Sequence, residues 1–96
     1  MTFEDTCRID VWLWRARFMK TRGAAARFVE EGKVRLVRPG QDEVRLDKAS
    51  RTVRPGDRLV FVLGGRVIDL GIEACGERRG PATEARTLYS LAEAAA

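Results

Sequence analysis

RIDVWLWRARFMKTRGAAARFVEEGKVRL, residues 8–36, is the stretch that decides the predicted fold of this chain. Two amphipathic patterns follow each other in it, each with apolar or small residues at i, i+3, i+4 and i+7. They predict one helix from residue 9 to about 19 and a second from about 22 to 31. Thr21, between them, is a good side-chain acceptor for the free N–H groups that open a helix. The stretch is therefore expected to form a helix, a tight turn and a second helix.

Downstream residues predict a small, mostly antiparallel sheet. Alternating apolar and basic residues indicate a half-buried strand over 33–37, a turn over 38–42 and a weak return strand over 43–46. Residues 59–63, LVFVL, are apolar on both faces and should form a central strand, with Gly64-Gly65 turning the chain back through 66–74. A C-terminal helix is expected from residue 83 to about 92. The predicted fold class is α+β, a helix-turn-helix packed on this sheet with a C-terminal helix added.

Length and composition describe one ordinary globular domain of 96 residues, 45% hydrophobic and 33% charged. We expect residues 1–7 to be a flexible lead, residues 8–75 to be the core domain, and residues 76–96 to be an extension. No apolar run approaches the roughly 18 residues that span a bilayer, and the N-terminus lacks the apolar segment of a secretory signal. A cytoplasmic protein that does not contact membranes is expected.

Positive charge gathers in the predicted helix-turn-helix and first strand. Residues 8–38 hold nine basic and three acidic residues, a balance of +6, while the rest hold nine basic and eleven acidic residues, a balance of −2. Lys20 and Arg22 would lie where the second helix begins, and free N–H groups there already favour an anion. Nucleic acid is the commonest acidic partner of such a surface.

The residue types needed for most catalysis are missing. Without histidine, neither a Ser/His/Asp nor a Cys/His nucleophilic site can be built, and two cysteines are too few for a tetrahedral metal site. No glycine-rich nucleotide loop is present. An acid/base site built from carboxylates alone stays open, and its candidates are Asp10, Glu30, Glu31 and Asp57. Acidic residues at helix ends and turns are, however, usually caps or solvated. We expect no enzyme, no metal and no cofactor.

Cys7 and Cys75 could form a disulfide, but two unpaired thiols are favoured in a reducing compartment.

The order and spacing of several short motifs resemble the RNA-binding S-four domain, with its alpha-L motif, over about residues 8–75. These motifs are Arg8-Ile9-Asp10, Leu13, Thr21-Arg22, Ala25, Val29, Gly32-Lys33-Val34 and Val53-Arg54-Pro55-Gly56-Asp57. Two further stretches, WLWRARFMKTR at 12–22 and ERRGPATEA at 77–85, are similar to the ribosome-associated heat shock protein 15 family. The chain departs from that pattern at Val11, where lysine is usual, and at residues 38–44, which replace a short hairpin.

The resemblance implies a free-standing domain that binds ribosomal RNA on the large subunit. It also implies action on subunits blocked by a nascent chain attached to tRNA, with tRNA as a possible second contact. We expect a monomer. Composition alone favours a solvated loop for the two arginines at 78 and 79, whereas the resemblance favours a functional one, and Trp14 could be structural or left exposed for a ligand. The expected RNA-contact residues are Arg8, Asp10, Trp14, Arg15, Arg17, Lys20, Thr21, Arg22, Lys33, Arg35, Arg78 and Arg79.

Two other classes of function stay open from the sequence. A protein interaction domain could dock a partner through the apolar faces of the first and last helices. A DNA-binding helix-turn-helix could use the same basic residues on a duplex. RNA is preferred because a basic surface can match the shape and phosphates of folded RNA, and the sequence predicts no long recognition helix for the major groove.

Overall fold

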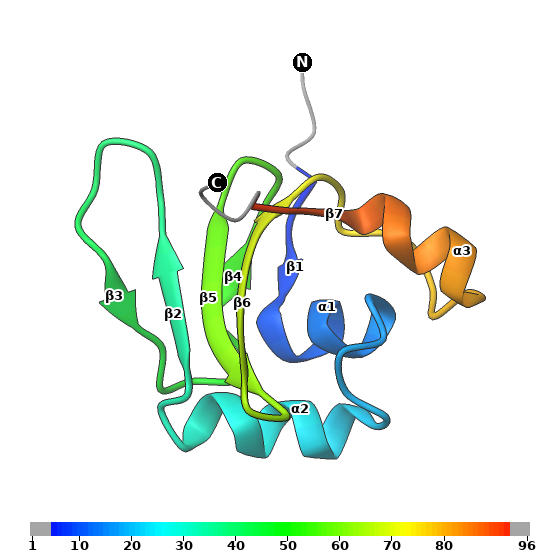
Figure 1. Ribbon diagram of the computed structural model, residues 1–96, viewed down its shortest axis with the longest axis horizontal. Coiled ribbons are helices and arrows are strands. Elements are labelled where there is room, and N and C mark those ends of the chain that lie inside the picture. Colours follow the sequence, from blue (N-terminus) through cyan, green and yellow to red (C-terminus); the bar gives the residue numbers. More distant parts are fainter. Residues whose placement is uncertain (1–4, 93–96) are drawn as a thin grey trace.

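The predicted helix-turn-helix is present as α1 (Ile9–Arg15) and α2 (Arg22–Glu30). The structure is a computed structural model that describes residues 5–92. Figure 1 shows α2 running along one end of the sheet, with α1 against its inner face. The side chain of Thr21 accepts a hydrogen bond from the N–H of Ala24 at 3.0 Å, so the predicted N-terminal cap of α2 is confirmed.

Helix α1 is shorter than predicted, because it ends at Arg15 and not near residue 19. Arg17 has a φ of 67° and is the one non-glycine residue with positive φ in the part of the chain that is described. The N–H groups of Arg17 and Phe18 donate to carbonyls of the last helical turn at 3.1 and 3.0 Å, the two bonds of a Schellman motif. Glycine usually occupies this position, so the sequence carried no stop signal. The turn directs Phe18 back into the core.

Helix α2 ends in the same way, and here the stop signal was readable. Gly32 has a φ of 76°, and its N–H donates to the carbonyl of Val29 at 2.9 Å. A side chain at this position would be strained by the backbone, and its Cβ would also lie 3.2 Å from the Cδ of Arg45. The predicted glycine terminator is confirmed.

Five antiparallel strands form the main sheet in the order β3-β2-β5-β6-β7, and two further strands, β1 and β4, pair separately. Their bounds are β1 Cys7–Arg8, β2 Val34–Val37, β3 Val44–Arg45, β4 Thr52–Val53, β5 Arg58–Leu63, β6 Arg66–Ile72 and β7 Tyr89–Leu91. The run predicted as central is β5, which lies between β2 and β6. Cross-strand pairs such as Val34 with Phe61 and Leu59 with Leu70 place apolar side chains on the inner face.

The C-terminal segment corrects the predicted helix over 83–92. Helix α3 covers only Ala82–Ala85, a 3₁₀ turn covers Arg86–Leu88, and the chain then becomes strand β7, whose Tyr89 pairs with Ile72 of β6. The expected apolar contacts of Ala85 and Leu88 are made, since both side chains are buried. The backbone beyond them pairs with the open edge of β6 through hydrogen bonds. The periodicity of a short stretch of sequence carries no information about such a distant partner.

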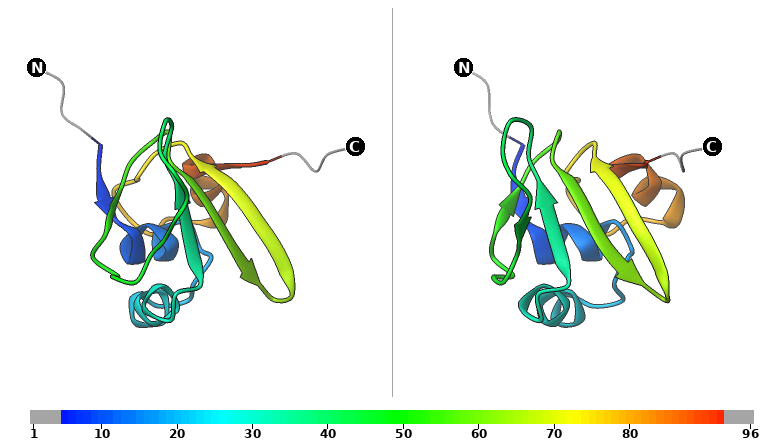
Figure 2. Two further views of the ribbon diagram at one scale, coloured as in Figure 1. Left: turned by 90° about the vertical axis from the view of Figure 1, so that its left-hand side faces the viewer. Right: turned by 60° about the vertical axis from the view of Figure 1, so that its left-hand side comes forward.

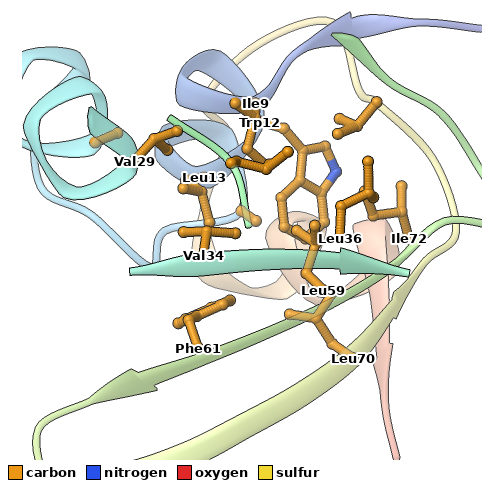
Figure 3. Packing of buried hydrophobic residues seen from close by; sticks show 14 of the residues in the cluster. Ile9, Trp12, Leu13, Val29, Val34, Leu36, Leu59, Phe61, Leu70 and Ile72 are labelled. Carbon is orange, nitrogen blue, oxygen red and sulfur yellow. The ribbon is translucent and has the colours of Figure 1, made fainter. Parts of the chain in front are cut away.

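The core lies between the helices and the inner face of the sheet (Figure 3). Trp12 of α1 is fully buried there, and its indole N–H donates to the carbonyl of Ala74 at 2.9 Å. Its ring also faces those of Phe18 and Tyr89, with centroids 6.1 and 6.4 Å away. Helix α1 is thus attached directly to the segment that follows β6.

Asp57 in the Pro-Gly turn before β5 is buried and has a structural role. Its carboxylate accepts two hydrogen bonds from the guanidinium of Arg38, at 2.8 and 2.7 Å, and one from the backbone N–H of Arg54 at 3.0 Å. These bonds satisfy the carboxylate and attach the end of β2 to the turn that precedes β5.

The two cysteines are free thiols, as the sequence favoured. Burial raises the pKa of both thiols, so each is protonated at neutral pH. Of the expected flexible lead, residues 1–4 lie outside the described residues. Asp5 accepts a hydrogen bond from the N–H of Cys75 at 3.2 Å, and Cys7 belongs to β1.

We predict that Asp57→Asn destabilises the protein by about 3 kcal/mol, because it leaves the largely buried guanidinium of Arg38 without its counter-charge. Urea unfolding would measure the change as a lower midpoint. Asp42→Asn is the matched control, since Asp42 is exposed and has no ion pair among the described residues. Its midpoint should move by the equivalent of less than about 0.5 kcal/mol. Equal midpoints for the two variants would contradict the structural role of Asp57.

Candidate nucleic-acid interface

The turn between α1 and α2 exposes two cations at the N-terminus of a nine-residue helix. Lys20 and Arg22 are both exposed, and neither has a hydrogen bond or ion pair with another described residue. Nothing lies within 4 Å of the position that a Cβ on Gly23 would occupy, so the backbone here is open to a ligand. Free helix N–H groups and two unpaired cations together form a site suited to phosphate. We call Lys20, Thr21, Arg22 and Gly23 the α2 cradle.

Arg8 and Asp10, both expected to contact RNA, form an ion pair. The guanidinium of Arg8 donates to both carboxylate oxygens of Asp10, at 3.0 and 2.9 Å, and these hydrogen bonds raise the pKa of Arg8. Asp10 is buried and also accepts from the N–H of Val11 at 2.8 Å, whereas half of the Arg8 side chain is exposed. The geometry therefore makes Asp10 a residue that orients Arg8.

Three of the expected contact arginines donate to backbone carbonyls, and together they attach the 75–80 segment to the end of α1. Arg15 donates to the carbonyl of Gly76 at 2.8 Å, and Arg17 donates to that of Gly80 at 2.6 Å. In the opposite direction, Arg79 donates to the carbonyl of Trp14 at 3.1 Å. The side chain of Arg15 is half-buried, and its Nε is buried without a hydrogen-bond partner. These arginines hold the fold together, which sequence reasoning did not anticipate because it treated each cation as solvent-facing.

The remaining expected residues lie at the surface. The half-buried ring of Trp14 has the guanidinium of Arg79 5.9 Å from its centroid, so one face is already occupied. Arg78 is exposed and forms an ion pair with Glu84 at 2.9 Å. Lys33 and Arg35 extend from the start of β2 and have exposed partners, Glu31 at 3.2 Å and Glu43 at 2.9 Å respectively. Exposed pairs of this kind are weak, so these cations remain available to a stronger anion.

A residue that sequence reasoning missed lies beside Lys33 and Arg35. Arg45 of β3 is exposed, pairs with Arg35 in the strand register, and has no ion pair among residues 5–92. With Lys33 and Arg35 it borders a cavity of about 590 Å³ on the outer face of the sheet. The alternation of Val44, Arg45 and Leu46 contained the signal. The strand was predicted too weakly, however, to show which face of the sheet the Arg45 side chain would occupy.

No candidate metal centre is found among the described residues. Within residues 5–92 there is no group of three or more histidine, cysteine, aspartate or glutamate side chains that could hold a metal ion. Over the same residues, no helix has the length and apolar character needed to cross a bilayer.

We predict that Arg17→Gly is less destabilising than Arg17→Ala. Both variants lose the hydrogen bond to Gly80, but glycine adopts the left-handed conformation without strain, whereas alanine keeps a cost of about 1 kcal/mol. Thermal unfolding should therefore give melting temperatures in the order wild type, Gly, Ala. The two variants should differ by roughly 4–8 °C. An alanine variant as stable as the glycine variant would contradict the positive φ at this position.

Comparison with known proteins agrees with this architecture. The S4 (S-four) domain matches residues 7–59, more than half of the chain. The chain is 36% identical over 90 residues to the heat shock protein 15 homolog of Haemophilus influenzae, an alignment covering 94% of this chain and 64% of that protein. It is 39% identical over 82 residues to heat shock protein 15 of Escherichia coli K12, covering 85% of this chain and 57% of that protein. The chain thus spans about three-fifths of the length of these curated relatives.

A solved structure of heat shock protein 15 from Vibrio cholerae, described as trimeric, is also similar. It superposes with a TM-score of 0.78 at 38% identity, covering 91% of this chain and 82% of that one. The agreement in sequence extends beyond the S4 domain into the C-terminal segment that the three arginines attach to α1. The chain belongs to the heat shock protein 15 family and carries the S4 domain, an RNA-binding module.

Proposed function

We propose that the protein binds ribosomal RNA of the large ribosomal subunit, with the α2 cradle as its primary phosphate site. The observation that carries the proposal is the contrast among the basic residues. Lys20 and Arg22 are exposed and unpaired within the described chain, at a helix N-terminus, while Arg15, Arg17 and Arg79 donate to backbone carbonyls. At the N-terminus of α2, exposed and unpaired cations therefore coincide with free helix N–H groups.

RNA fits this surface better than duplex DNA. The two helices have only seven and nine residues, and α1 has its inner face packed in the core. A reader of the DNA major groove needs a helix that presents several side chains to base edges along its length. A short helix end surrounded by cations suits instead the phosphates and shape of a folded RNA. Exposed Arg8, Lys33, Arg35 and Arg78 would extend the contact, with Asp10, Arg15, Arg17 and Arg79 positioning the surface through their hydrogen bonds.

Family membership supports a more specific role. We propose that the protein acts on large subunits blocked by a nascent chain still attached to tRNA, in the cytoplasm during stress. It would act as a monomer and by binding, without a catalytic step. Sedimentation with purified ribosomal particles tests this role directly. Co-migration with free large subunits is expected, and migration with small subunits alone would overturn it.

Salt dependence separates RNA binding from apolar docking of a protein partner. If about four to six phosphates are contacted, a plot of log K against log salt should have a slope of roughly −3 to −5. Apolar docking would respond little to salt. Competition between structured ribosomal RNA and duplex DNA of equal length gives the second comparison, and equal affinity for both would argue for unspecific polycation binding.

We predict that Arg22→Glu weakens binding to large subunits by about tenfold or more, because it places a repelling charge in the cradle. Arg86→Glu is the matched control, since Arg86 is exposed on the 3₁₀ turn and each variant lowers the net charge from +4 to +2 by replacing +1 with −1. The control should weaken binding less than about threefold. An equal loss in the two variants would mean that net charge, and not the cradle, determines affinity.

A further inference from the structure

The outer face of the sheet carries an apolar patch that no helix covers. Val62 of β5 and Val67 of β6 are cross-strand partners, and 56% and 70% of their surfaces are exposed. Val60, two residues before Val62, lies on the same face and is half-buried. The right-hand view in Figure 2 turns this face toward the reader, with α1 behind β2 and β5. The solvent face of an antiparallel sheet is ordinarily polar, so three valines here call for an explanation.

Cations border this patch along β2 and β3. Lys33, Arg35 and Arg45 line the cavity of about 590 Å³ whose floor includes the three valines, and Glu43 is its one acidic lining residue. The lining therefore carries three positive charges and one negative charge. The volume lies within the roughly 300–1,000 Å³ typical of sites for small organic ligands. An apolar floor with a cationic border fits a flat, weakly polar ring attached to an anion.

We propose that this cavity takes one unpaired nucleobase of the bound RNA, with the adjoining phosphate on Lys33 and Arg45. The inference rests on the proposed function, because it adds a base site to the same RNA interface. The valines would contact the plane of the base, and the guanidinium of Arg35 or Arg45 would stack on it or hold the phosphate. Such a site reads an RNA element with a splayed-out base, which the α2 cradle alone would not distinguish from a regular helix.

The position of the cavity agrees with a continuous path for one strand. Lys33 follows the C-terminus of α2, and the cradle lies at its N-terminus, so the length of the helix separates the two sites. Nine residues of α-helix span about 13 Å, which roughly four stacked nucleotides of one strand would cover. A second copy of this chain is less suited to the cavity, because a two-fold contact would bring the two sets of cations together.

The test measures affinity for an octauridylate probe that carries one central 2-aminopurine, and affinity for purified large subunits. Val62→Phe should tighten probe binding by about threefold to tenfold through aromatic stacking. It should also lower the fluorescence of the bound 2-aminopurine below that seen with the wild-type protein. Val62→Asn should weaken binding to the probe and the subunits by about threefold, with unchanged melting because the side chain is exposed. Leu91→Phe and Leu91→Asn are the controls, since Leu91 of β7 is similarly exposed but does not line the cavity.

The outcomes separate the two proposals. Affinity that falls in Arg22→Glu but is unchanged in both Val62 variants would overturn the base site and leave the proposed function standing. Wild-type protein that binds neither probe nor large subunits would overturn both. A change in sedimentation coefficient of the free protein in the Val62 variants, without a change in RNA affinity, would assign the cavity to a second copy of the chain and overturn the base site.

Discussion

The side chain of Trp12 is the contact on which most of this small fold depends. It is fully buried in α1, and its indole N–H reaches the carbonyl of Ala74, sixty-two residues later in the chain. A buried indole N–H without an acceptor would cost about 1–3 kcal/mol. This hydrogen bond therefore fixes the distance between α1 and the segment that follows β6. The Schellman turn at Arg17 brings Phe18 onto the same ring, and β7 brings Tyr89. One aromatic cluster thereby fixes α1, the turn that follows it and the C-terminal strand.

The basic residues differ in what their side chains reach. Arg15, Arg17, Arg38 and Arg79 donate to carbonyls or to a buried carboxylate, whereas Lys20 and Arg22 have no such partner among the described residues. A guanidinium has five N–H donors in a rigid fork, which suits it to joining backbone segments. Net charge therefore overstates the surface that is available to RNA. What matters is where unpaired cations coincide with exposed backbone N–H groups, and that occurs at the start of α2.

Much of the fold could be predicted from the sequence because its signals are local. Thr21 and Gly32 mark the ends of α2, alternation marks β2, and a continuous apolar run marks β5. The failures share a physical cause, since each depends on a distant segment. Arg17 adopts a left-handed conformation while its side chain binds Gly80, and residues 89–91 form a strand because β6 has an open edge. For the site, the exposed cations of the α2 cradle were foreseen, but the carbonyl partners of the other arginines and the position of Arg45 required the tertiary structure.

The lengths of the two outermost strands also bear on how the protein behaves when it is concentrated. The sheet ends in β3, of two residues, and in β7, of three residues. Long, flat, apolar edges invite backbone pairing between molecules, whereas very short or charged edges resist it. Arg45 adds a charge to one of these edges. The chain can therefore expose three valines on the face of its sheet while offering little template for strand-by-strand growth into fibrils.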